Sequence, residues 1–126
     1  MNEGTTSLKE ARGQQTLLYV FSPSKQERLY QLHMDTFADH QIALDDHHVV
    51  LAEVFEHGQG YMGSDELPCD NCRGLRQEYR IMPGQFKVVL VGRDSVVKLC
   101  ADSCISTEEI IMRVENEPQV MESMYY

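Results

Sequence analysis

The sequence predicts an α/β sandwich, in which a four-stranded mixed sheet carries helices on both faces. Two apolar runs carry this prediction, residues 16–21 (TLLYVF) and residues 86–91 (FKVVLV). Each is rich in β-branched or aromatic side chains, which is typical of a strand that is covered on both faces. The chain has 126 residues, which is enough for one domain with a single modest core.

A helix is expected after the first apolar run. Ser24 and Glu27 have the spacing of a capping box, so the helix should begin there. Leu29, Leu32 and Phe37 recur at helical spacing and are expected to form its buried stripe.

A second strand is expected at residues 48–55, after a polar loop through Asp45 and Asp46. Strand, helix and strand in this order form a βαβ unit. Its two strands should be parallel and its connection right-handed.

A long loop is expected at residues 56–71, which contain three glycines. A short helix should follow, with Leu75 and Tyr79 on one face. Pro83 and Gly84 are expected to stop that helix.

The last part of the chain predicts a hairpin and a closing helix. Residues 86–91 and 96–99 read as two strands joined by a turn at residues 92–95. Ser106 with Glu109 forms a capping box, so the last helix should begin just after Ser106. The resulting order, β-α-β-α-β-β-α, is the thioredoxin arrangement. The domain is expected to span residues 16–117, between a polar N-terminal tail (1–15) and a C-terminal tail (118–126).

The charge of the chain limits its partners. Lys and Arg number 11 against 20 Asp and Glu, which gives a net charge of −9. Such a surface repels phosphate backbones and anionic lipid, so neither nucleic acid nor a membrane is expected as a partner. The N-terminus lacks the apolar core of a signal peptide. A cytoplasmic protein is therefore expected, or an exported or extracellular one if the sequence is a trimmed mature form.

Three stretches share their pattern with a known family. They are residues 17–23 (LLYVFSP), residues 75–79 leading into 86–94, and residues 97–99 followed by the closing helix. On these residues the chain resembles the DUDES-type domain. That domain of unknown function occurs in small prokaryotic proteins and in extracellular vertebrate proteins with sushi repeats or long coiled segments. The resemblance implies a thioredoxin-like fold and a peroxiredoxin-like role, although Ser95 stands where the family usually has glycine.

Cys69 and Cys72 form a CxxC motif, the sharpest chemical signal in the chain. Asp70 or Asn71 is expected to cap the helix that follows, whose N–H groups and dipole would stabilise a thiolate. In a chain with thioredoxin-like order, this motif predicts redox catalysis by Cys69 and Cys72. However, a thioredoxin-type enzyme carries its CxxC directly after the first strand, and a peroxiredoxin's attacking cysteine is expected there too. Residues 22–25 (SPSK) hold no thiol.

Two other interpretations of the cysteines compete with redox catalysis. Cys69, Cys72, Cys100 and Cys104 give CxxC, a long gap and CxxxC, and four thiolates suit a tetrahedral zinc site with His57 as a spare ligand. Nothing in the sequence brings the two pairs together, so neither a metal nor another cofactor is expected. The interpretation ranked first is that the cysteines are free thiols in loops and at strand ends.

The first hypothesis for the function is a thioredoxin-like module without catalytic activity that binds an unidentified protein partner. Arg73, Arg76 and Arg80 form a basic stripe that is expected to be a solvated helix face and that could receive an acidic segment. The alternative is a thiol-disulfide or peroxiredoxin-like redox protein that uses the Cys69–Cys72 pair. The sequence is compatible with an enzyme and with a binding protein.

Overall fold

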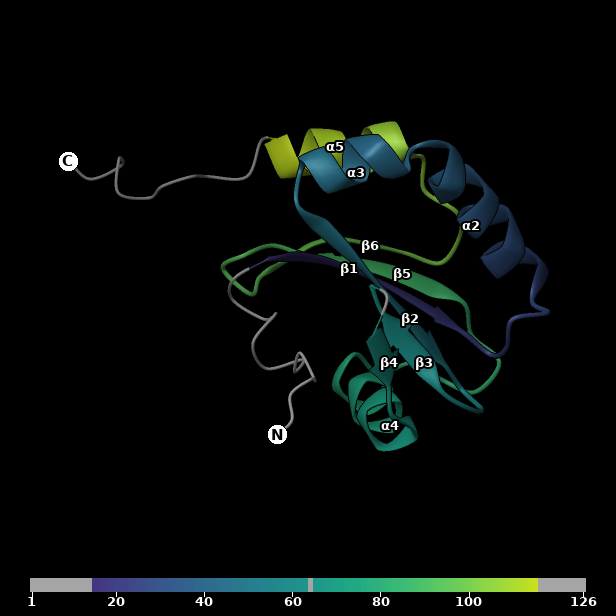
Figure 1. Cartoon of the computed structure of the whole chain (residues 1–126). Helices are drawn as coiled ribbons and strands as arrows, with labels where there is room; N and C mark the ends of the chain where they lie inside the picture. The colour runs from purple at the N-terminus through teal and green to yellow at the C-terminus, as the bar shows by residue number, and fades with distance from the viewer. Residues whose placement is uncertain (1–14, 64, 116–126) are drawn as a thin grey trace.

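A six-stranded sheet runs through the molecule and carries helices on both faces (Figure 1). The computed structural model describes residues 15–63 and 65–115. In chain order the elements are β1 (Thr16–Ser22), α2 (Arg28–Asp39), α3 (Gln41–Asp46), β2 (Val49–Phe55), β3 (Gly60–Met62), β4 (Asp65–Leu67), α4 (Cys69–Glu78), β5 (Lys87–Val91), β6 (Val97–Ala101) and α5 (Thr107–Glu115). The predicted α/β sandwich is confirmed, with six strands in place of four.

The strands lie in the order β4-β3-β2-β1-β5-β6. Strand β1 is parallel to β2, and every other neighbouring pair is antiparallel. The expected βαβ unit and the expected β5–β6 hairpin are therefore both present. Strands β2, β1, β5 and β6 make up the mixed sheet that the sequence predicts, and β3 and β4 extend it beyond β2.

The long loop predicted for residues 56–71 is wrong, because these residues contain the β3–β4 hairpin. Gly60 pairs with Leu67, and Met62 pairs with Ala52 of β2. Each of the two strands has only three residues, which is too few for a clear alternation of apolar and polar side chains. Strand β3 is held in the sheet by its pairing with β2, and β4 by its pairing with β3. The exposed Asp65 in β4 fits an edge strand, where charged side chains discourage pairing with another chain.

Helices α2, α3 and α5 cover one face of the sheet, and α4 covers the other (Figure 1). Helices α3 and α5 lie side by side, and an ion pair of 3.0 Å joins His47 Nε2, just after α3, to Glu115 Oε2 at the end of α5. Alternate side chains of β1 enter the two core layers. Phe21 packs toward α4, whereas Leu18 packs toward α2 and α5.

Helix α2 begins at Arg28, four residues after the predicted start at Ser24. The Ser24 hydroxyl accepts a hydrogen bond from the Gln26 backbone N–H (3.2 Å), so it stabilises a turn before the helix. The residue at the helix N-cap is Glu27, and its side chain makes no capping hydrogen bond. The capping box predicted for Ser24 and Glu27 is therefore wrong.

The buried face of α2 also differs from the predicted stripe. Leu32 is 46% exposed, whereas Tyr30 and His33 are buried. Both polar side chains have partners far along the chain. The Tyr30 hydroxyl donates to Glu53 Oε1 (2.5 Å), and His33 Nε2 accepts from the Ile105 N–H (3.2 Å). These contacts offset the free-energy cost of burying polar atoms. Tyr30 and His33 can therefore lie on the buried face of the helix, where the prediction had placed Leu32.

Three further boundaries can be compared with the prediction. The expected polar loop around Asp45 and Asp46 is helical, as α3. The start of α5 is confirmed, since the Glu109 N–H donates to the Ser106 hydroxyl (3.1 Å). The predicted tails lie outside the described residues, apart from Gln15.

Candidate functional site

The CxxC motif lies in the first turn of α4. The helix begins at Cys69, and the residue before it, Pro68, is the N-cap. The prediction that the two cysteines sit on a loop ahead of the helix is therefore wrong, and so is the prediction that Asp70 or Asn71 caps it. An apolar residue at position 68 cannot give the capping signal that polar side chains give.

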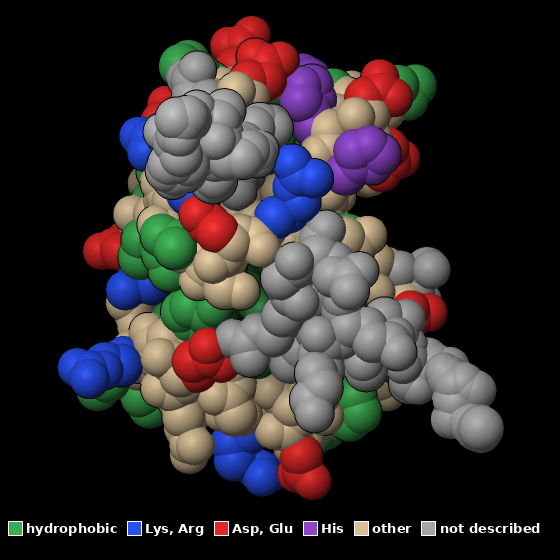
Figure 2. Space-filling view, turned by 90° about the vertical axis from the view of Figure 1, so that its left-hand side faces the viewer, with side chains coloured by type: hydrophobic (Ala, Val, Ile, Leu, Met, Phe, Trp, Pro, Cys, Tyr) green, Lys and Arg blue, Asp and Glu red, His purple; other side chains and the backbone are tan. Residues whose placement is uncertain are grey.

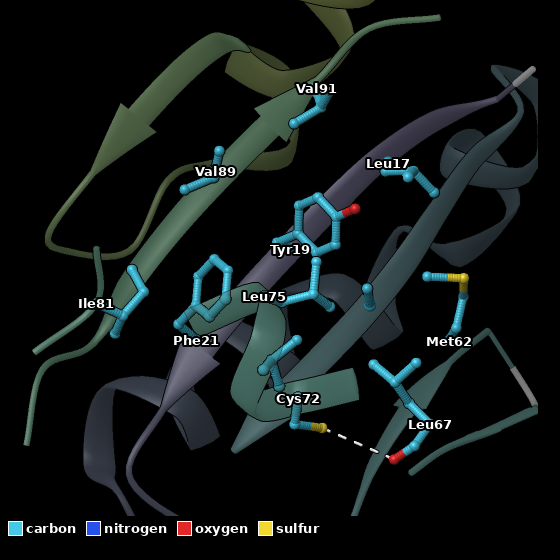
Figure 3. Packing of buried hydrophobic residues seen from close by; sticks show 12 residues of the cluster. Leu17, Tyr19, Phe21, Met62, Leu67, Cys72, Leu75, Ile81, Val89 and Val91 are labelled. Carbon is cyan, nitrogen blue, oxygen red and sulfur yellow. Dashed lines mark hydrogen bonds between the residues drawn. The ribbon is translucent and has the colours of Figure 1, made fainter. Parts of the chain in front are cut away.

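The two thiols have different surroundings. Cys69 is exposed, whereas Cys72 is 2% exposed and belongs to the core layer beneath α4. The Cys72 thiol donates to the Leu67 carbonyl oxygen (3.7 Å), and Figure 3 shows it pointing from α4 toward that atom. Burial raises the pKa of the Cys72 thiol, and hydrogen bonds from the backbone of Phe55 and Gly60 oppose this rise. Of the two thiols in the motif, Cys69 is therefore the one that solvent and ligands can reach.

Gly60 makes room for the sulfur of Cys72. A Cβ atom at position 60 would lie 2.8 Å from Cys72 Sγ and 2.3 Å from the Glu53 carbonyl oxygen. No side chain larger than hydrogen fits there without a shift of the backbone. A glycine inside a strand often marks such a close approach, so this was a signal that the sequence carried.

A pocket of about 450 Å³ opens beside Cys69. The end of β2 and the residues after it form one wall, α4 forms another, and residues 81–83 close a third. Its polar lining includes Glu56, His57, Arg73 and Arg76. Ligands of α/β proteins commonly bind beyond the carboxyl ends of the strands, and this pocket lies beyond the end of β2.

Glu56 and Arg76 hold the pocket walls together. Glu56 Oε1 accepts from the Gly84 N–H (2.8 Å) and lies 3.9 Å from the Arg76 guanidinium. Arg76 also donates to the Met82 carbonyl oxygen (3.1 Å). The Arg76 side chain is only 13% exposed, so the prediction of a solvated basic stripe is wrong at this position. Glu56 was not predicted as a site residue, because its main partner, Gly84, is 28 residues away in the sequence.

The turn between β1 and α2 lies at the carboxyl end of β1, on the same side of the sheet's strand ends as the pocket beyond β2. The Glu56 N–H donates to the Ser22 carbonyl oxygen (3.0 Å), which fixes the ends of β1 and β2 side by side. The Ser22 hydroxyl donates to the Ser24 carbonyl oxygen (2.9 Å). The Lys25 ammonium lies 4.9 Å from the ring centroid of Tyr61. Residues 22–25 thus form a closed turn without a thiol.

The other two cysteines lie elsewhere. Cys100 is exposed on β6, the edge strand at the opposite end of the sheet from β4. Cys104 precedes α5, where its thiol donates to the Leu29 carbonyl oxygen (3.5 Å) and burial raises its pKa. Within residues 15–63 and 65–115, no three His, Cys, Asp or Glu side chains gather as a metal-binding group. The four-cysteine zinc site is therefore not assembled, and His57 lies at the pocket rim.

Acidic and basic side chains are interspersed among apolar ones on the face shown in Figure 2. In the part of the chain that the structure describes, no helix has both the length and the apolar character that a membrane crossing requires.

This fold is thioredoxin-like, as the solved structures that resemble it show. A 2-Cys peroxiredoxin from Plasmodium vivax matches with a TM-score of 0.66 at 14% identity, over 86% of this chain and 80% of that one. AhpC from Mycobacterium tuberculosis matches with a TM-score of 0.63 at 10% identity, over 94% of this chain and 79% of that one. Thioredoxin peroxidase I of Plasmodium yoelii has a TM-score of 0.64 at 15% identity, over 87% and 76% of the two chains.

The chain belongs to the DUF4174 family, a domain of unknown function, whose model matches residues 7–119. No curated protein shows a significant match to this sequence.

Proposed function

We propose that this protein is a thiol-disulfide redox protein whose reactive centre is the Cys69–Cys72 pair at the start of α4. One observation carries the proposal. Cys69 is exposed on the wall of a pocket, and Cys72, three residues later in the same helical turn, is buried. Residues three apart lie on the same side of a helix, which lets the two sulfurs approach each other.

The chemistry follows from this difference in exposure. The Cys69 thiolate attacks one sulfur of a substrate disulfide, which releases the other half as a thiolate and leaves a mixed disulfide on Cys69. The Cys72 thiol then loses its proton and attacks Cys69 Sγ. This step frees the second substrate thiol and forms the Cys69–Cys72 disulfide, so that two electrons pass from the pair to the substrate. A dithiol reductant restores the pair for the next turnover.

The position of the pair supports the exchange in two ways. The N-terminal end of a helix favours negative charge, such as that of an attacking or departing thiolate. Burial raises the pKa of the Cys72 thiol and so disfavours its thiolate, which suits Cys72 to the second step and not to the first attack.

The proposal places the chemistry on α4 and not at the turn between β1 and α2. A peroxiredoxin's attacking cysteine is expected at that turn, where this chain has Ser22, Pro23, Ser24 and Lys25. A serine hydroxyl does not undergo disulfide exchange. We therefore propose disulfides, and not peroxides, as the substrates. We also propose that the chain is related to the DUDES-type domain, because that resemblance implies a redox role as well.

The competing proposal is the binding module without catalysis that the sequence favours. The pocket beside Cys69 suits it equally well, and a protein partner remains its expected ligand. The two proposals differ in whether the Cys69–Cys72 pair catalyses disulfide exchange.

Turnover measured with two matched cysteine variants tests the proposal. The full chain is incubated with dithiothreitol and a disulfide substrate, and formation of the free substrate thiol is followed. Cys69→Ser should abolish turnover, whereas Cys100→Ser removes another exposed thiol, outside the pocket, and should leave turnover unchanged. Turnover that survives Cys69→Ser would refute the assignment. No turnover by the unmodified chain with either small or protein disulfides would favour the binding module.

A further inference from the structure

We infer that the pocket beside Cys69 selects small disulfides that carry carboxylate groups. This inference rests on the proposed thiol-disulfide exchange and names its substrate class. It starts from the size of the pocket, about 450 Å³, which lies within the range of small-molecule sites. A compound of that size can occupy the pocket while its sulfur reaches Cys69 on the wall.

The charge of the lining differs from that of the whole chain. The lining contains two guanidinium groups, of Arg73 and Arg76, and one carboxylate, of Glu56. The chain as a whole has a net charge of −9. The pocket is thus a locally basic site on an acidic protein, and guanidinium groups bind carboxylates through paired, charge-assisted hydrogen bonds.

The two arginines have different tasks. Arg76 is largely buried and is held by Glu56 and by the carbonyl oxygens of residues 81 and 82, so it forms a fixed wall. Arg73 is exposed, and its ion pair with Asp70 (3.0 Å) is exposed on both sides. Such surface pairs contribute little free energy, so Arg73 can exchange Asp70 for a carboxylate of the ligand.

The remaining lining suits the rest of such a compound. Phe55, Ile81 and Pro83 supply apolar surface for methylene groups. His57, which follows Glu56 at the end of β2, is exposed at the rim and offers a further hydrogen-bonding group. The bound disulfide is then attacked by the Cys69 thiolate, which forms Cys69–S–S–R and releases the second half, RS⁻.

Two disulfides of opposite charge test this selectivity. Glutathione disulfide carries carboxylates, whereas cystamine carries only ammonium groups. The rate at which each consumes the free Cys69 thiol, seen as the mixed disulfide or as the Cys69–Cys72 disulfide that follows from it, is measured by alkylation and mass spectrometry on the full chain, at about 0.15 M salt to screen long-range charge. The net charge of −9 attracts cystamine and repels glutathione disulfide. We expect glutathione disulfide to react about tenfold faster nevertheless, because the pocket binds its carboxylates.

Matched arginine variants assign the effect to the pocket. Arg73→Gln should slow the reaction of glutathione disulfide about tenfold and leave that of cystamine unchanged. Arg80→Gln removes an exposed arginine outside the lining and should change neither rate. If cystamine reacts as fast as glutathione disulfide, or if Arg73→Gln has no effect, the carboxylate selectivity is refuted while the exchange at Cys69 stands. If neither compound modifies Cys69, the proposed exchange itself fails.

Discussion

The sulfur of Cys72 lies against the backbone of Gly60, so closely that a Cβ atom at position 60 would be 2.8 Å from it. The same Cβ would be 2.3 Å from the Glu53 carbonyl oxygen, which belongs to the neighbouring strand β2. The β3–β4 hairpin, missed by sequence analysis, therefore shapes the buried half of the CxxC site.

Gly60→Ala should destabilise the protein by about 2 kcal/mol, because the added methyl group overlaps backbone that cannot move freely. Gly74→Ala is the matched control. A Cβ at position 74 meets nothing within 4 Å, and alanine favours the helix, so stability should rise by about 0.5–1 kcal/mol. Chemical denaturation of both variants measures the difference. Equal stabilities would show that the contact between Gly60 and Cys72 is not as close as described.

Leu90→Ala should cost about 3 kcal/mol, since Leu90 is fully buried on β5 beside β1. Ile42→Ala provides the comparison, because Ile42 is 78% exposed and its loss should change stability by no more than about 0.5 kcal/mol. Both values come from urea unfolding curves. A small cost at Leu90 would contradict the central position of β5 in the sheet.

Ser95→Gly should stabilise the turn between β5 and β6 by about 0.5 kcal/mol. Ser95 has φ +66°, a conformation that glycine adopts without the steric cost of a Cβ. Ser103→Gly, at an exposed position without positive φ, should instead be neutral or slightly destabilising. Thermal unfolding of the two variants separates the outcomes. A lower melting temperature for Ser95→Gly would argue against this turn geometry.

His33 should make the protein less stable below neutral pH. Burial lowers the pKa of His33 from 6.5 to about 4, and its Nδ1 atom finds no hydrogen-bond partner among residues 15–63 and 65–115. Between these pH values the unfolded chain binds a proton that the folded chain does not. The free energy of unfolding therefore falls as the pH drops from 6.5 toward 4, by up to about 3 kcal/mol.

His33→Gln retains a side-chain hydrogen-bond acceptor but does not titrate, so the fall in stability between pH 6.5 and 4 should become shallower in this variant. His40→Gln removes an exposed histidine and should keep the steep fall. Unfolding by urea at several pH values compares them. The same pH dependence in His33→Gln as in the unmodified protein would mean that His33 is not the group responsible.

Burial was predicted correctly from the sequence for strands that are apolar on both faces. The runs that contain Phe21 and Leu90 are apolar on both faces, so burial could be inferred without knowing the neighbours. Helix α2 was harder. Tyr30 and His33 are buried because of partners at Glu53 and Ile105, and such distant partners leave no mark in the local pattern.

The candidate site, too, was predictable from the sequence only in part. The spacing of Cys69 and Cys72 identified the motif, and the composition predicted the negative net charge of the chain, from which the basic lining of the pocket differs. The burial of Cys72 depends on Gly60 and Leu67, and the pocket wall depends on the contact between Glu56 and Gly84. These contacts come from the way β3, β4 and the segment before β5 fold around α4.

Disulfide mapping of the oxidised full chain tests the Cys69–Cys72 assignment most directly. The reduced protein is equilibrated in dithiothreitol buffers of increasing oxidising strength, the remaining thiols are alkylated, and the peptides are identified by mass spectrometry. We expect one disulfide between Cys69 and Cys72 to form in a two-electron step, while Cys100 and Cys104 stay alkylated. Four alkylated cysteines in every buffer, or a disulfide that joins Cys69 to Cys100 or Cys104, would contradict the redox centre at the start of α4.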